Sequence, residues 1–377
     1  MNRDAAFIYS DELENYHYPP ECPFKTERAA MTRETLESMG LLSGVGRRRV
    51  APEPADRQVV EKFHTSRYLN VLLDAQAGDM GIEGLNMGLG TPETPVFKVM
   101  YDYAILACGA TLTGMNLLLD GENRIAFNPS GGYHHARPEK ASGFCYINDV
   151  ALACLLLGER VDRVLFLDVD GHHCDGVQDA FYERSDVMTI SLHETGETLF
   201  PGTGQIADIG RGEGEGFSVN IPMLEGTYNA PDLQAFGELV PPLVEAYDPD
   251  AIVFEVGMDG LSGDPLVHLS LTNQAYAEVA ERVIGFDRPL LVTGGGGYHP
   301  ENTARGWALL WSILCGGEAQ PDLNVGMGGV MLESTEWRGG LRDRTQVVDE
   351  EQQRRVQPQM DAVIESVKKH IFPLHGL

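Results

Sequence analysis

The sequence VLFLDVDGHHCDG, residues 164–176, begins as an apolar strand and ends in a cluster of polar residues. Side chains on a strand alternate between two faces, so Asp168, Asp170 and His172 are expected on one face. Residues 165, 167 and 169 are apolar and face the other side, where we expect a layer of helices. Two carboxylates at the end of a buried strand are costly without a cation. The stretch therefore predicts a buried strand that leads into a cation site.

Further apolar runs of strand length recur along the chain and alternate with helical patterns. The predicted strands are Ala6–Ile8, Ile125–Phe127, Val164–Val169, Met188–Ser191, Phe217–Ile221, Ala251–Val256 and Leu290–Thr293. The predicted helices are Val99–Leu119, Ile147–Leu157, Pro231–Tyr247, Asn273–Ile284, Glu301–Leu314 and Asp349–Ile371. This alternation predicts an α/β fold with a mainly parallel, multi-stranded sheet and helices on both faces. No linker rich in Pro, Gly or Ser divides the chain, so we expect one domain over residues 1–377, with an irregular segment at Glu318–Arg344.

The composition limits the classes of function. The chain has 377 residues, 43% of them hydrophobic, and a formal net charge of −28. So acidic a protein is repelled by phosphate backbones and anionic membrane surfaces, which argues against nucleic acid and membranes as partners and favours cationic ones. The six cysteines form no CxxC pair, the first residues lack a signal-peptide core, and no apolar run approaches a membrane span. We therefore expect a cytoplasmic location; no feature of the sequence specifies an oligomeric state.

Polar residues follow four of the predicted strands, where the ligands of parallel sheets bind. Asp170 and His172 follow one strand, and Asp259 follows another. Carboxylate oxygen and imidazole nitrogen are zinc ligands, and a catalytic zinc keeps three protein ligands and an open position. These three residues are therefore candidate ligands of one zinc ion. The alternative, in which Asp168 and Asp170 cap turns and His172 is a core histidine, would be favoured if the DxDxH stood alone.

The adjacent pair His134-His135 follows a third strand. Histidine titrates near neutral pH and is the commonest general acid or base. A carboxylate on the far ring nitrogen fixes the tautomer and raises basicity, and Asp168 and Asp175 are available for this role. The alternative is that both histidines join His172 and Asp170 in a closed structural zinc site.

The fourth strand is followed by GGGGYHPENTARGW, residues 294–307. A glycine-rich turn before a helix suggests phosphate binding, but neither the dinucleotide-binding nor the P-loop spacing is present. Tyr298 could instead donate its hydroxyl to an oxyanion beside the metal.

These motifs together resemble the zinc-dependent histone deacetylase and acetoin-utilisation family, on its class I side. The resemblance covers residues 7–314, and residues 318–377 are expected to form a C-terminal extension packed on that part. The motifs are CPFKTER, GGYHHA, SGFCYIND, LDVDGHHCDGVQDAF, SLHE with LFPGTG, GMDGLSGDP and GGGGYHPENTARGW. The resemblance implies the arginase–deacetylase fold and a prokaryotic relative of these enzymes.

The resemblance also implies a role for individual residues. Asp170, His172 and Asp259 become zinc ligands, His135 the general base and then acid, and His134 its electrostatic partner. Asp168 and Asp175 orient the two histidines, and Tyr298 polarises the amide carbonyl. The implied substrate tunnel consists of Gly143, Phe144, Phe200 and Leu266, with Glu93 as an approximate match to the acidic residue that holds a peptide backbone. A structural potassium ion is implied at Asp168 and Ser191, with backbone carbonyls of Asp170, His172 and Leu192.

The sequence departs from the family pattern at several positions. Cys174 replaces the usual glycine, and we expect little effect because its side chain is small. Pro265 and Glu301 replace arginines that serve inositol phosphate and corepressor binding in eukaryotic class I enzymes, so the resemblance does not extend to that regulation. The resemblance favours removal of short acyl groups from the lysine side chains of proteins or peptides. An acetylpolyamine amidohydrolase is the second hypothesis, weakened because Leu266 stands where an acid would meet a second ammonium. A non-catalytic reader of acyl-lysine is the third, and the presence of every proton-transfer residue argues against it.

Overall fold

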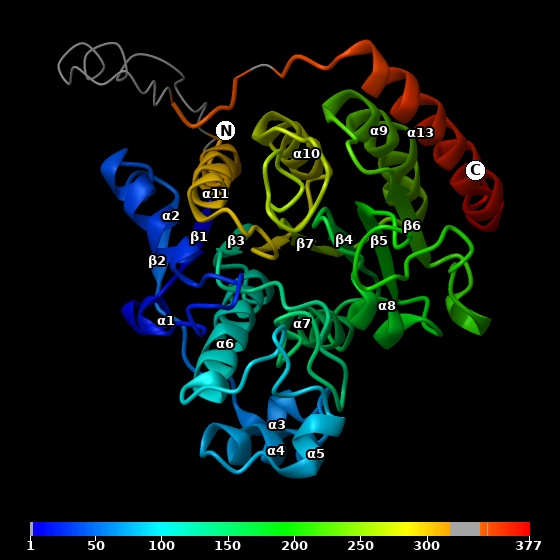
Figure 1. Cartoon of the computed structure of the whole chain (residues 1–377). Coiled ribbons are helices and arrows are strands. Elements are labelled where there is room, and N and C mark those ends of the chain that lie inside the picture. Colours follow the sequence, from blue (N-terminus) through cyan, green and yellow to red (C-terminus); the bar gives the residue numbers. More distant parts are fainter. Residues whose placement is uncertain (1–2, 317–339, 345) are drawn as a thin grey trace.

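The computed structural model describes residues 3–316, 340–344 and 346–377 and is built around one eight-stranded sheet (Figure 1). The strand order is β2-β1-β3-β8-β7-β4-β5-β6, and all neighbouring strands are parallel. The predicted α/β class with a parallel sheet is therefore confirmed. The organisation of residues 1–377 as one domain stays a prediction.

The strands and helices follow one another along the chain in the alternating order expected of parallel sheets. The strands are β1 Ala5–Ile8, β2 Arg47–Val50, β3 Ile125–Asn128, β4 Val164–Asp168, β5 Val187–Glu194, β6 Ser218–Met223, β7 Ala251–Glu255 and β8 Leu290–Thr293. The helices of the first half are α1 Asp11–Asn15, α2 Glu27–Ser38, α3 Arg57–Val60, α4 Ser66–Gln76, α5 Gly81–Asn86, α6 Met100–Leu119, α7 Asp149–Gly158 and α8 Asp175–Phe181. Those of the second half are α9 Asn229–Tyr247, α10 Asn273–Gly285, α11 Pro300–Leu314 and α13 Glu350–Ile371, with short 3-10 turns at Gly212–Gly214 and Phe372–His375.

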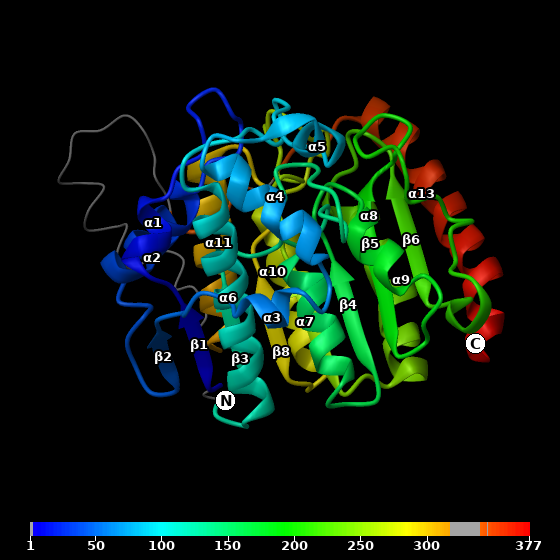
Figure 2. The same ribbon diagram turned by 90° about the horizontal axis from the view of Figure 1, so that it is seen from below.

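Helices cover both faces of the sheet because its strands are apolar on both sides. In Figure 1, α9, α10 and α11 lie above the strands, and α6 and α7 lie below them. Figure 2 shows α6 and α7 in front of the sheet and α9, α10 and α11 behind it. Leu165 and Leu167 belong to the core shared with α9–α11, whereas Val164 and Phe166 belong to the core shared with α6 and α7. The alternation predicted for this strand is therefore present.

The seven predicted strands all form, within three residues of their predicted ends. The eighth, β2, was missed because its sequence RRRV is mostly charged and partly exposed; it pairs with β1 at one edge of the sheet. The short helices before residue 99 were also missed. The predicted C-terminal helix forms as α13 and contacts α9 and β6. Most of the predicted irregular segment Glu318–Arg344 lies outside the described residues.

One expectation about membranes needs correction. Helix α6 has 20 residues and is apolar enough, by length and composition, to cross a membrane. Fourteen of its residues are buried, and it contacts β3, β8 and α7. Its apolar character is explained by this position in the core of the protein.

The sheet topology determines where the predicted site residues meet. Four strands precede the polar motifs, and these strands, β3, β8, β7 and β4, are consecutive in the sheet. Because they are parallel, their carboxyl ends lie at the same edge. Residues more than 160 positions apart in the sequence are thereby brought to one place.

Candidate active site

Asp170, His172 and Asp259 converge beyond the ends of β4 and β7. One potential ligand atom from each lies within 4.8 Å of the other two, and all three residues are buried. The Nδ1 atom of His172 lies 2.8 Å from Asp259 Oδ2 and 3.2 Å from Asp170 Oδ1. Two carboxylates and an imidazole nitrogen in this arrangement match a zinc donor set.

The electrostatics of this group favour the binding of a cation. Burial opposes a charge on His172, but hydrogen bonds to Asp170 and Asp259 outweigh it and raise the pKa of His172 to about 10. Burial, together with the charge of Asp170, raises the pKa of Asp259 to about 7. A divalent cation would supply the charge that these two carboxylates require, so the residues present fit a metal.

Glycines make room for the two carboxylates. The backbone N–H of Gly296 donates to Asp170 Oδ2 at 2.5 Å, and that of Gly171 donates to Asp259 Oδ1 at 2.8 Å. A Cβ atom on Gly257 would lie 1.9 Å from Asp170 Oδ2, and one on Gly296 would lie 2.1 Å from Asp259 Oδ2. Any side chain at either position would displace a proposed ligand. This explains the need for glycine at both positions.

The two adjacent histidines contact each other and one carboxylate each. Nδ1 of His134 lies 2.9 Å from Asp168 Oδ2, and Nδ1 of His135 lies 2.7 Å from Asp175 Oδ1. Their Nε2 atoms are 3.0 Å apart. The His135 ring centroid lies 5.8 Å from that of His172, so the pair is beside the metal-binding group. Each histidine thus has one carboxylate partner, Asp168 for His134 and Asp175 for His135.

The histidines differ in charge because their surroundings differ. Burial opposes a charge on His134, but Glu255 and Asp168 outweigh it and raise the pKa of His134 well above its usual value. Burial and the neighbouring charge of His134 lower the pKa of His135 to about 4, against the opposing effect of Asp175. The ring of His135 is therefore neutral near pH 7 and can accept a proton. The ring of His134 is instead protonated on both nitrogens and carries a positive charge.

The SGFCYIND motif holds the histidine loop. The side-chain amide of Asn148 donates to the carbonyl oxygens of His134 and Ala136, at 3.0 and 2.9 Å. The Asp149 carboxylate accepts from the N–H groups of Gly132 and Tyr133, at 3.1 and 2.8 Å. The sequence pattern alone gave these two residues no role. The signal in the sequence was a pair of polar residues at the beginning of an otherwise apolar helix.

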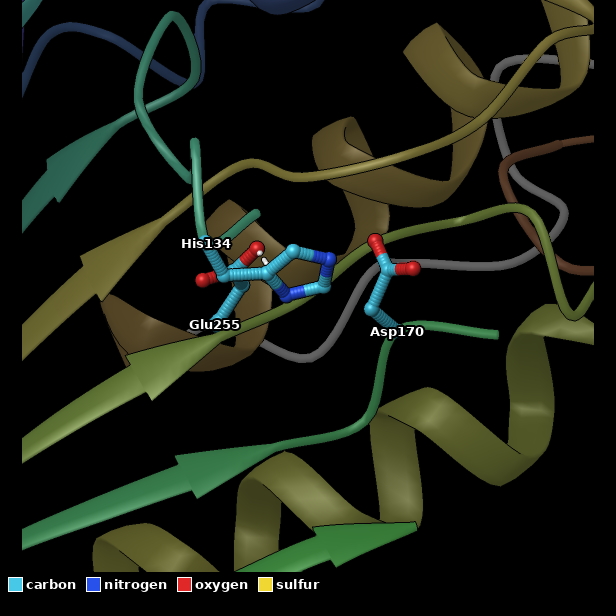
Figure 3. A group of neighbouring side chains, drawn as sticks. All are labelled: His134, Asp170 and Glu255. Atoms are coloured by element: carbon cyan, nitrogen blue, oxygen red, sulfur yellow. Dashed lines mark ion pairs between the residues drawn. The ribbon is translucent and has the colours of Figure 1, made fainter. Parts of the chain in front are cut away.

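Glu255 is a third residue at this site to which the sequence pattern gave no role. It ends β7, is fully buried, and places Oε1 3.0 Å from His134 Nδ1, at an angle that makes no hydrogen bond. Figure 3 shows the His134 ring between Glu255 and Asp170. These three residues could also hold a metal by their donor types. Since Nδ1 of His134 already bonds Asp168, we interpret Glu255 instead as a buried acid, whose burial raises its pKa well above the usual value. A charged residue in the apolar strand Ala251–Val256 was the signal in the sequence.

Tyr298 lies next to the metal-binding group. Its ring centroid is 6.0 Å from that of His172 and 5.6 Å from that of Phe144. Burial, and then the charges of Asp259 and Asp170, raise the pKa of Tyr298 well above its usual value. The hydroxyl therefore stays protonated and can donate a hydrogen bond.

The residues predicted to form a tunnel lie near the histidine pair and Tyr298. Phe200 is 37% exposed and its ring centroid lies 5.0 Å from that of His135, whereas Phe144 is buried. A Cβ on Gly143 would lie 2.4 Å from the His135 ring and 3.0 Å from Phe200, so the backbone passes close to both. Leu266 packs against the same apolar cluster as Phe144 and Tyr298.

Two further predictions concern the rim and the potassium site. Glu93 is exposed, and its carbonyl oxygen accepts from the Phe144 N–H at 3.0 Å, which places it next to the tunnel residues. Asp168 and Ser191 are partners in register on β4 and β5, with Leu192 following. The potassium site at these residues stays a prediction.

Comparisons with known proteins point to one family. Residues 22–314 match the histone deacetylase domain. The chain is 40% identical to histone deacetylase 8 of Xenopus tropicalis over 291 residues, which are 77% of this chain and 78% of that one. It is 36% identical to histone deacetylase RPD3 of Saccharomyces cerevisiae over 83% of this chain and 72% of that one. The crystal structure of an HDAC homolog from Aquifex aeolicus superposes with a TM-score of 0.86 at 30% identity, covering 97% of this chain and all of the other.

Proposed function

Because the chain belongs to the histone deacetylase family, we propose that it hydrolyses the amide bond of acyl-lysine side chains in proteins or peptides, with zinc as its metal. The acyl group is acetyl or another short chain. The products are the free lysine amine and a carboxylate. The family membership supports the deacetylase reaction, and the finer assignments below rest on the geometry of this chain.

The proposal is carried by one observation. Three metal-binding side chains, a histidine pair with two carboxylates, and a tyrosine meet at the carboxyl ends of four adjacent strands. Amide hydrolysis needs a base for water, an acid for the leaving amine, and stabilisation of an oxyanion. This site contains a candidate for each requirement.

The residues would hold and assist zinc as follows. Asp170, His172 and Asp259 would be its ligands. When bound, zinc supplies Lewis-acid polarisation of the substrate carbonyl and acidifies the attacking water. The remaining steps are carried out by side chains of this chain.

The histidines move the protons. His135 donates its Nδ1–H to Asp175, which leaves a lone pair on Nε2 that can accept the proton of the attacking water. The same nitrogen then returns that proton to the leaving amine. His134, which Glu255 and Asp168 hold in its charged form, favours negative charge on the reacting group. Tyr298 donates its hydroxyl to the oxyanion.

The tunnel residues select the substrate. Phe144 and Phe200 would enclose the aliphatic part of an acyl-lysine chain, with Gly143 and Leu266 at its entrance and Glu93 on the rim. The net charge of −28 favours peptides with a positive charge. We propose no nucleic-acid or membrane partner, and a cytoplasmic location. A structural potassium ion at Asp168, Ser191 and Leu192 is part of the proposal.

A single panel of substrates tests the proposed function. The purified protein is analysed for metal content and assayed on lysine peptides with acyl groups of increasing length and on acetylated polyamines. We expect about one zinc per chain and turnover of short acyl-lysine peptides. The His135→Gln variant should lose a factor of about 10²–10⁴, whereas His370→Gln, on the exposed side of α13, should match the wild type.

Three outcomes would contradict the proposal. Preferred turnover of acetylated polyamines would favour the polyamine amidohydrolase instead. Binding of acyl-lysine peptides without turnover, in the zinc-loaded protein, would favour a reader. Activity without zinc would exclude the assigned metal.

A further inference from the structure

Asp264 links the loop that carries Leu266 to the backbone of Tyr298. Its Oδ2 atom accepts from the Tyr298 N–H at 2.7 Å. Its Oδ1 atom accepts from the N–H of Leu266 at 2.9 Å and from that of Val267 at 3.3 Å. Both carboxylate oxygens are thus occupied by backbone donors from two segments more than 30 residues apart in the sequence.

The Tyr298 segment is mostly glycine, so its conformation is set by the hydrogen bonds that it makes to its surroundings. Tyr298 follows four consecutive glycines, and Gly295 and Gly297 have φ angles of +146° and +129°. Glycine populates such angles readily and has no side chain to restrict them, so the segment depends on its hydrogen bonds for a single conformation. Arg28 donates to the carbonyl oxygens of Gly295 and Gly297, at 3.0 and 2.8 Å, and leaves the Tyr298 N–H to Asp264.

The loop of Leu266 and Val267, which Asp264 holds, also contacts the metal-binding turn. A Cβ atom on Gly171 would lie 2.7 and 2.8 Å from the two methyl groups of Val267, and 3.2 Å from Asp259 Cγ. Val267 therefore packs directly on the turn between Asp170 and His172. One carboxylate thus connects the tyrosine, the tunnel entrance and the loop over the metal-binding turn.

We propose that Asp264 is a positioning residue that sets the place of the Tyr298 hydroxyl relative to the reacting carbonyl. The proposal rests on the proposed deacylase function. Asp264 touches neither substrate nor metal in this role, and it acts through the tyrosine. Without it, the glycine-rich segment samples arrangements in which the hydroxyl misses the oxyanion.

The Asp264→Asn variant tests this role with little change in volume. An asparagine has one acceptor oxygen, so it cannot serve both the Tyr298 N–H and the Leu266 and Val267 N–H groups. We expect kcat to fall by about 10- to 100-fold, because the loss is limited by the contribution of the hydroxyl, about 10²–10³. KM and zinc content should stay within a factor of about two, since the tunnel and the ligands remain.

The matched control is Asp250→Asn. Asp250 also holds a loop, because its Oδ2 atom accepts from the N–H groups of Asp162 and Arg163, but it precedes β7 at the opposite end of the sheet. This variant should keep wild-type kcat. A similar loss of kcat in both variants would mean a general effect on stability and would overturn the proposal.

A double-mutant cycle separates positioning from mere structural support. In the Tyr298→Phe background there is no hydroxyl to place, so adding Asp264→Asn should lower the residual rate by less than about threefold. If Asp264→Asn lowers the rate by the same factor in both backgrounds, Asp264 does not act through Tyr298 and the proposal is wrong.

Amide hydrogen exchange supplies a readout that does not depend on activity. Residues 294–299 should exchange faster in Asp264→Asn than in the wild type and in Asp250→Asn. Unchanged exchange would overturn the proposal. If the wild type fails to hydrolyse any substrate of the panel, the proposed function fails, and exchange alone then decides whether Asp264 fixes the Tyr298 segment.

Discussion

Removing only the hydroxyl of Tyr298 gives the most direct test of catalysis at this site. In the Tyr298→Phe variant the ring keeps its contacts with His172 and Phe144, and the backbone keeps its bond to Asp264. Zinc binding and the tunnel should therefore survive. What is lost is one donor that, in the proposed mechanism, bonds the oxyanion more strongly than the ground-state carbonyl.

The size of the effect follows from that single donor. Removing one donor of an oxyanion typically lowers turnover by about 10²–10³, or about 2.7–4 kcal/mol of transition-state stabilisation. The raised pKa of Tyr298 means that the donor is present throughout the neutral range, so the loss should not depend on pH there. Substrate affinity should change little, because the hydroxyl contributes mainly after the carbonyl is attacked.

The assay compares kcat, substrate affinity and zinc content for the wild type, Tyr298→Phe and Tyr247→Phe. Tyr247 is the matched control, because its hydroxyl bonds the carbonyl oxygens of Val164 and Ser185 at the far end of β4. We expect kcat to collapse only in Tyr298→Phe. Near-normal turnover in that variant would refute the oxyanion role and make Tyr298 a packing residue.

Three further predictions concern the base, the metal and a buried acid. In Asp175→Asn, His135 loses a carboxylate that raises its pKa, so we expect kcat to fall while zinc stays bound; loss of zinc would show that Asp175 belongs to the metal site. Removing metal with a chelator should lower the melting temperature, and zinc at 100 times its dissociation constant should restore about 2.7 kcal/mol; Asp259→Asn should not respond to zinc in the same way. Burial raises the pKa of Asp232 to about 7. In the unfolded chain the pKa is about 3.9, so the folded state binds the extra proton between these values, and stability should fall by about 1.4 kcal/mol per pH unit as pH rises towards 7. Urea unfolding at pH 5.5 and 7 should show a smaller difference for Asp232→Asn than for the wild type; equal differences would contradict the assignment.

Much of the fold could be predicted because its signals are local. Apolar runs such as 164–167 and 251–254 are buried on both faces, and the helices between them are long and apolar, so periodicity and length identified them. Strand β2 was not predicted because most of its residues are charged, and only its pairing with β1 makes it a strand. Local preference carries no information about such pairing.

The residues of the candidate site could likewise be predicted only in part. The chemical types were visible in the sequence, because aspartate, histidine and tyrosine directly after apolar strands are rarely there for packing alone. Glu255 was not identified, because its significance depends on the position of His134, which approaches it from β3. Asn148 and Asp149 were quoted within a motif, but their bonds to the histidine loop depend on how α7 sits under that loop.

The sequence by itself determined the order of seven strands and of the long helices, the parallel α/β class and most of the residues able to bind a metal and move protons. These follow from composition and spacing within segments of about ten residues. Only the tertiary structure decided which carboxylate meets which histidine, that His134 and His135 differ in charge, and that Asp264 joins the Tyr298 segment to the tunnel entrance. The physical reason is that burial and charge at a side chain are set by neighbours from distant segments, and packing of the whole sheet brings those neighbours together.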